Sequence, residues 1–178
     1  MQRIIVIGTS CSGKTQLARR LAAKLHMPHI ELDRLYWLPN WEQRPREEFR
    51  ALVQEAVTAE LWVSCGNFSE VRNVRWNRAT HVVWLNYPLR IVFYRALKRT
   101  VVRCFTKEEL FSGNTESFRQ SFMSHDSILW WILKTHHRYR REYQRFRNES
   151  TYAHLQWIVL RHPREAEQLL TKLCWTHD

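Results

Sequence analysis

The sequence is poor in cysteine and has no long apolar segment, and each absence argues against a class of protein. Its four cysteines form no CxxC pair and show no metal-ligand spacing, which favours reduced thiols over a zinc module. No stretch approaches the roughly 18 apolar residues of a membrane span, and the first apolar run is too short for a signal peptide. We therefore expect a cytoplasmic protein without a membrane segment.

Acidic residues are also scarce relative to basic ones. The chain has 28 Lys and Arg against 17 Asp and Glu, a formal net charge of +11. This balance favours anionic partners such as nucleotides, nucleic acid or an acidic surface, although charge alone fits a solvated surface equally well. A hydrophobic content of 44% argues against a disordered chain, and 178 residues without repeats or linkers fit a single domain.

Short apolar runs alternate with helical patterns along the whole chain. The pattern predicts strands at 4–7, 29–32, 61–64, 81–85 and 155–160. It predicts helices at 14–25, 45–60, 89–105 and 127–147 and a last one from Pro163 onward. Such alternation is typical of an α/β sandwich with a parallel sheet.

The segment from Gly8 to Thr15 matches the phosphate-loop pattern GxxxxGK[ST] without a mismatch. Its glycines allow successive N–H groups to face the phosphates, and the helix that follows directs its positive end to the same anion. Lys14 is expected to reach the β- and γ-phosphates of ATP and Thr15 to bind Mg²⁺. The predicted nucleotide contacts are Gly8, Ser10, Cys11, Ser12, Gly13, Lys14, Thr15 and Gln16.

Later blocks of sequence carry a family resemblance. They are LDRLYWLPNW (32–41), PREEF (45–49), GNFS (66–69), GNTESF (113–118), SILWW (127–131) and LRHPREAEQLL (160–170). With the phosphate loop they resemble the adenylate-kinase-like P-loop proteins of the DNA topology modulation (FlaR-like) family. The resemblance implies a nucleoside-monophosphate-kinase-like fold: a five-stranded parallel sheet in the order 2-3-1-4-5, with a helical lid over about 100–147. The family name implies an effect on DNA.

Acidic residues for phosphoryl transfer are few. Asp33 follows the second predicted strand, where the resemblance implies an acid near the metal and the acceptor; a turn or helix-cap role is the alternative. The family usually has DGNY where this chain has Cys65, Gly66, Asn67 and Phe68, and sulfur is a poor ligand for Mg²⁺. Metal binding therefore depends on Thr15, phosphate oxygens, water and Asp33, and slow or absent catalysis stays open.

Arginines on two helices are candidates for phosphate contacts. Arg95, Arg99 and Arg103 recur every four residues and so share one side of a helix. The resemblance to adenylate kinase implies that Arg95 packs on adenine and that Arg99 contacts phosphate. On the next helix, Arg138 and Arg141 are predicted to act on the transferring phosphoryl group as lid arginines; a solvated helix face is the alternative.

Acceptor contacts are predicted at Asn67, at Arg75, and at Trp37, which with Trp41 could form a wall, although such tryptophans are more often core residues. The sequence thus favours a small ATP- and Mg²⁺-dependent kinase acting on a nucleoside monophosphate or similar small acceptor. One alternative is a nucleic-acid-binding ATPase or polynucleotide kinase, and another is a non-catalytic nucleotide sensor. The direction of the arginines distinguishes a lid from a nucleic-acid surface.

Overall fold

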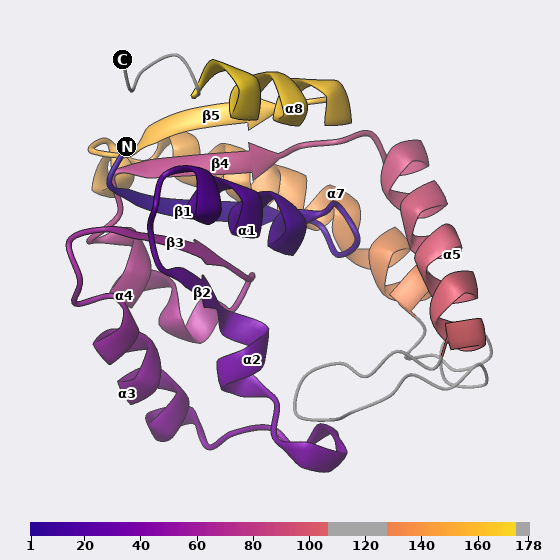
Figure 1. Ribbon diagram of the computed structural model, residues 1–178, viewed down its shortest axis with the longest axis horizontal. Helices are drawn as coiled ribbons and strands as arrows, with labels where there is room; N and C mark the ends of the chain where they lie inside the picture. Colours follow the sequence, from indigo (N-terminus) through magenta and orange to yellow (C-terminus); the bar gives the residue numbers. More distant parts are fainter. Residues whose placement is uncertain (107–127, 174–178) are drawn as a thin grey trace.

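Five short apolar segments form one parallel sheet in a computed structural model that describes residues 1–106 and 128–173 (Figure 1). The sheet has the order β2-β3-β1-β4-β5, and each neighbouring pair runs parallel. The strands are β1 (Arg3–Gly8), β2 (His29–Glu31), β3 (Trp62–Cys65), β4 (His81–Leu85) and β5 (Gln156–Leu160). The predicted fold and strand order are confirmed.

Helices connect the strands and cover both faces of the sheet. They are α1 (Lys14–Lys24), α2 (Leu32–Tyr36), α3 (Arg46–Ala56), α4 (Arg72–Trp76), α5 (Leu89–Thr106), α7 (Ile128–Asn148) and α8 (Pro163–Lys172). Short 3-10 turns occupy Pro39–Trp41, Ser69–Val71 and Ser150–Tyr152. Part of the predicted lid, including the 113–118 block, lies outside the described residues. Within them, no helix has the length and apolarity of a membrane span.

The central strand β1 is buried on both sides because successive side chains point to opposite faces. Ile4 and Val6 belong to a core under α1 and α8, whereas Ile5 and Ile7 belong to a second core under α3, α4 and much of α7. These four side chains are at most 1% exposed. Burial of each contributes about 1.5–3 kcal/mol, which explains the uninterrupted apolar run in the sequence.

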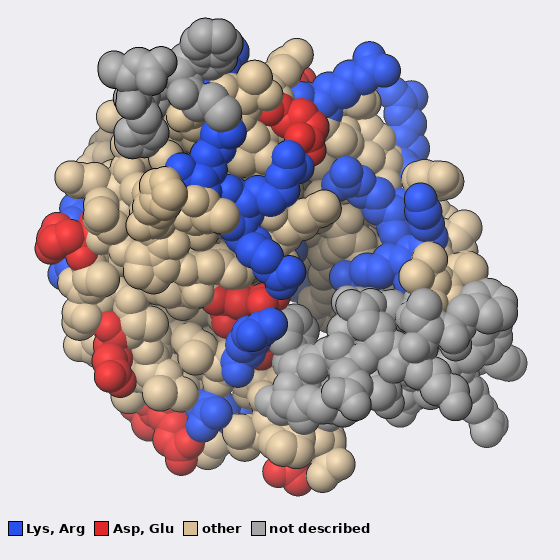
Figure 2. All heavy atoms as spheres, in the orientation of Figure 1, with Lys and Arg blue, Asp and Glu red and all other residues tan. Residues whose placement is uncertain are grey.

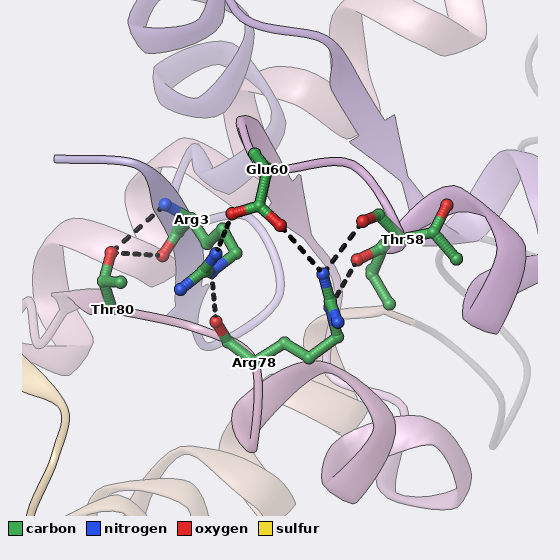
Figure 3. Close-up of polar contacts among 6 residues, drawn as sticks. Arg3, Thr58, Glu60, Arg78 and Thr80 are labelled. Carbon is green, nitrogen blue, oxygen red and sulfur yellow. Dashed lines mark hydrogen bonds and ion pairs between the residues drawn. The ribbon is translucent and has the colours of Figure 1, made fainter.

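The amino-terminal edge of the sheet is closed by a polar network (Figure 3). Arg3 donates to Glu60 at 2.7 Å and to the carbonyl of Arg78 at 2.5 Å. The guanidinium of Arg78 in turn donates to the carbonyls of Val57 and Thr58. This edge thus ties β1 to the turns before β3 and β4, and its arginines are occupied with structural contacts. The phosphate-loop residues lie at the opposite, carboxyl edge.

Candidate functional site

The predicted phosphate loop leaves the carboxyl end of β1 and leads directly into α1. Gly8 has φ 149°, and a Cβ atom there would lie 2.9 Å from the carbonyl oxygen of Leu85. Gly13 has φ 98° and precedes α1, whose first turn carries no acidic residue. The loop therefore needs glycine at its start for close approach to β4, and the helix directs free N–H groups toward it.

Lys14 holds a partly buried positive charge at this loop. Its Nζ atom donates to the carbonyl of Thr9 at 3.0 Å. Burial lowers the pKa of Lys14, while the nearby Asp33 and Cys65 act in the opposite direction. In the described part of the chain, Lys14 forms no ion pair with a carboxylate. Its ammonium group thus keeps donor capacity for an anion that enters the loop.

The other predicted loop contacts occupy the same turn. Ser10, Cys11 and Thr15 are partly buried, Ser12 is buried, and Gln16 is exposed.

Asp33 approaches this site from the first turn of α2, directly after β2. Burial raises the pKa of Asp33, and the neighbouring charge of Lys14 lowers it. The charges of Asp33 and Lys14 therefore act on one another, and the role of Asp33 near a metal and an acceptor, which the resemblance implies, stays a prediction. A second acid, Glu31, went unrecognised in the sequence; it is 7% exposed and pairs with Arg34 at 3.1 Å.

Cys65 lies beside the predicted metal ligand. Its Sγ atom donates to the hydroxyl of Thr15 at 3.8 Å and lies 3.5 Å from Nε2 of His29. Burial raises the pKa of Cys65 to about 12, so its thiol stays neutral. The oxygen atoms of Thr15 and Asp33 fit Mg²⁺, whereas the sulfur of Cys65 does not. Among the described residues, no group of three or more His, Cys, Asp or Glu is placed to hold a metal ion.

Asn67 and Arg75 support the loop after β3. The side-chain amide of Asn67 donates to the carbonyl of Gly8 at 2.6 Å, which connects this loop to the phosphate loop. Arg75 donates to Gly66 O at 3.1 Å and to the hydroxyl of Ser64 at 3.4 Å. The prediction that Arg75 contacts the acceptor is corrected, because its side chain is 1% exposed and turned to β3.

One arginine of α5 contacts the phosphate loop, and a second lies near it. Arg95 donates to the carbonyl of Ser12 at 2.7 Å, and its guanidinium lies 5.6 Å from the ring centre of Tyr87. The charge of Arg99 contributes to lowering the pKa of both Lys14 and Asp33, which places it nearby. Arg95 therefore turns toward the phosphate loop, whereas the direction of Arg99 and the contacts of both arginines with a nucleotide stay predictions. The side chain of Arg103 lies outside the described part.

A second basic depression adjoins the loop. It encloses about 600 Å³ and is lined by Trp84, Asn86, His137, Arg140, Arg141 and Gln144. Leu85 pairs with Gly8 in the sheet, and its chain neighbours Trp84 and Asn86 line the pocket. Lys and Arg side chains also surround a hollow near α5 on the face drawn in Figure 2.

The lid arginines take different positions. Arg141 lines the pocket, and so does Arg140, which the sequence did not single out. Arg138 is exposed and lies over the ring of Tyr139 at 5.4 Å. The spacing of basic residues along the helix did not single out Arg140. The packing of α7 against the sheet decides which of its basic side chains lie beside β4. The role of Arg138 stays a prediction.

Trp37 packs within an aromatic group rather than lining this pocket. Its ring lies 4.9 Å from Tyr36 and 5.5 Å from Trp41, both edge to face. Tyr36 continues the group to Phe68 at 4.5 Å. Both tryptophans are only partly buried, so these ring contacts hold the segment between β2 and α3, and their place at an acceptor wall stays a prediction.

Comparison with known proteins identifies the fold. No protein-family model matches the sequence, and no curated protein matches it. The shikimate kinase from Bacteroides thetaiotaomicron is similar in structure, with a TM-score of 0.53 and 17% identity over 97% of this chain and 96% of that one. The Acinetobacter baumannii shikimate kinase in complex with shikimate gives a TM-score of 0.55 and 15% identity, covering 98% and 91%.

A gluconokinase from Sinorhizobium meliloti 1021 is also similar, with a TM-score of 0.51 and 18% identity over 99% and 98% of the two chains. These identities are low, so the likeness establishes the fold and leaves the reaction to be argued from the site.

Proposed function

We propose that this protein is an ATP-dependent kinase that transfers the γ-phosphoryl group to a nucleoside monophosphate or a similar small anionic acceptor. The observation that carries the proposal is the partly buried ammonium group of Lys14, which has no ion-pair partner among the described residues. It lies in a phosphate loop that Arg95 also contacts. The structural neighbours, which are named as kinases of small molecules, support the same reaction class.

Different residues of the loop and its neighbours would contact different parts of ATP and Mg²⁺. Backbone N–H groups between Gly8 and Thr15 receive the phosphates, and Lys14 neutralises charge on the β- and γ-phosphates. Arg95 fixes the loop through Ser12 and adds positive charge beside it. Thr15 and Asp33 would hold Mg²⁺, which neutralises charge on the phosphate oxygens when it is bound.

The pocket beside β4 is suited to the acceptor. Arg140, Arg141 and His137 present positive charge or N–H donors, and paired guanidinium groups bind phosphate or carboxylate in a fixed geometry. An anionic acceptor is therefore favoured over a neutral sugar. Asp33, which would hold Mg²⁺, follows β2 and is separated from β4 by β3 and β1 in the sheet, so we assign it to the metal and not to proton transfer from an acceptor at β4.

A phosphoryl-transfer screen tests the proposal. The purified protein is incubated with ATP and Mg²⁺ and with nucleoside monophosphates, hydroxy acids or neutral sugars, and ADP formation is followed. We expect turnover with an anionic acceptor and its loss in Lys14→Ala, with Lys24→Ala on the same helix as the control. Turnover that is unchanged in Lys14→Ala would contradict the proposal. ATP binding without turnover on any acceptor would favour the nucleotide sensor.

A nucleic-acid partner is the second candidate, and the surface of α7 favours it. Lys134, Arg138, Arg145 and Arg147 are exposed on this helix. The only acid of α7, Glu142, pairs with Arg72. An affinity for short DNA that falls steeply with salt, and that drops when Arg145 and Arg147 are replaced, would support this candidate. Arg95 turns to the phosphate loop and therefore supports the kinase.

A further inference from the structure

Exposed apolar side chains gather on α5 and on the start of α7. Of the nine large hydrophobic side chains that are exposed in the described part of the chain, seven belong to these two segments. Surface hydrophobic residues are usually scattered singly, so their concentration on two elements points to a partner. We define the outer surface by six of them: Tyr94, Leu97 and Val101 on α5, and Trp130, Trp131 and Leu133 on α7.

The two helices place these side chains at one margin of the molecule. Ala96 of α5 and Ile132 of α7 belong to the same buried core, and the two helices pack on each other. Figure 1 shows the start of α7 beside the later turns of α5. Tyr94, Leu97 and Val101 are spaced three and four residues apart, so they form one stripe on the side of α5 that faces away from this core. Exposed residues of both helices therefore contribute to the same margin.

The two helices supply almost only positive charge to this margin. The sequence of α5 contains no Asp or Glu. Arg90 and Lys98 are exposed on α5, and Lys134 is exposed on α7. The single acid of α7, Glu142, lies two turns further along the helix and pairs with Arg72 at 2.6 Å. Charge complementarity therefore favours an anionic partner for the outer surface.

The side chains of the outer surface are of the kinds that proteins place at a membrane interface. Tryptophan and tyrosine rings lie at the level of the lipid headgroups, where their apolar and polar parts are both accommodated. Leucine and valine side chains enter the boundary with the acyl chains, as they do on interfacial amphipathic helices. Exposed lysine and arginine are attracted to anionic headgroups. An anionic bilayer matches all three kinds of residue at once.

Other partners match the outer surface less well. A nucleic acid is bound by basic side chains and by aromatic rings that stack on bases, whereas Leu97 and Val101 offer neither interaction. A second copy of this chain in a two-fold contact would place the same face on both sides of the interface. The exposed Arg90 and Lys98 would then approach their equivalents, and the like charges would repel.

We propose that the outer surface docks this protein on an anionic phospholipid bilayer. The aromatic rings lie among the headgroups, the aliphatic side chains enter the acyl boundary, and the basic side chains contact lipid phosphates. No step of the proposed phosphoryl transfer involves the lipid, so the docking does not rest on the proposed function.

Flotation with lipid vesicles tests the docking and needs no enzymatic activity. Vesicles of equal parts phosphatidylcholine and phosphatidylglycerol are compared with vesicles of phosphatidylcholine alone. We expect the wild type to bind the anionic vesicles at least about tenfold more tightly than the neutral ones, and to bind them less as salt is raised. Binding to neither kind of vesicle would overturn the proposal.

Two matched leucines locate the contact. Leu97→Glu should weaken binding to the anionic vesicles at least about tenfold, because it places a carboxylate among the residues that enter the lipid. Leu61→Glu is the control, since Leu61 is 42% exposed, Leu97 is 39% exposed, and the two variants change the net charge equally. Leu61 precedes β3 and lies outside the outer surface. Equal vesicle binding by the two variants would overturn the assignment of the surface.

A second pair of variants decides the question when circular dichroism shows that Leu97→Glu does not fold. Lys98→Gln removes one exposed charge of α5 and should weaken binding about fivefold, whereas the exposed Lys172→Gln on α8 should not. Equal binding by these two variants would overturn the proposal. Two other results would also overturn it in a protein that does not bind vesicles. One is binding of short DNA that Leu97→Glu abolishes, and the other is a dimer that Leu97→Glu dissociates.

Discussion

Replacement of Arg95 is the sharpest test of how α5 supports the phosphate loop. Arg95→Ala removes the 2.7 Å hydrogen bond to the Ser12 carbonyl and the positive charge beside Gly13. A hydrogen bond with a charged donor contributes about 1.5–3 kcal/mol, and we take the lower limit because the side chain is only half-buried and water can replace it. A loss of about 1.5 kcal/mol corresponds to roughly tenfold weaker binding of ATP.

Isothermal titration with ATP and Mg²⁺ measures this loss. Arg90→Ala is the matched control, because Arg90 lies exposed on the same helix and its removal changes the net charge equally. Arg95→Lys should be intermediate, since lysine keeps the charge but lacks the planar set of donors. Equal ATP affinities for Arg95→Ala and Arg90→Ala would refute the reasoning, because the effect would then come from net charge alone.

Three further outcomes are expected. Gly66→Ala should lower the free energy of unfolding in urea by roughly 2–5 kcal/mol, because its Cβ would lie 2.8 Å from Leu32 Cβ at a φ of 126°; an unchanged free energy of unfolding would contradict this steric argument. Arg141→Gln should raise the KM for the acceptor about tenfold and leave that for ATP unchanged, with the exposed Arg147→Gln as control. Cys65 should resist iodoacetamide at pH 8 until the chain unfolds, because burial raises its pKa to about 12; rapid modification in the native protein, located by mass spectrometry, would refute this.

The sheet was predictable because its strands are short apolar runs whose burial leaves a direct mark in the sequence. The run 81–85 is found as β4 with the same bounds, and the phosphate loop lies between β1 and α1 as the motif requires. Element ends were less predictable. The helix expected over 45–60 ends at Ala56, and the strand expected over 29–32 ends at Glu31, where α2 follows from Leu32. Contacts with neighbouring elements set where each helix or strand ends, and these contacts are not visible in the local sequence pattern.

Side-chain partners across the sheet edge are the part that the sequence could not supply. Arg75 is a cation near the predicted site, and the sequence therefore suggested a ligand contact. Its guanidinium instead turns inward and donates to the carbonyl of Gly66. Parallel pairing brings the ends of distant strands together, so His29, Cys65 and Thr15 meet although their positions in the chain span 50 residues from Thr15 to Cys65. The phosphate-loop motif follows β1, and so it predicts that the site lies at the carboxyl edge of the sheet. The chemistry of that site depends on what neighbouring strands add, and here β3 adds sulfur where Mg²⁺ would favour oxygen.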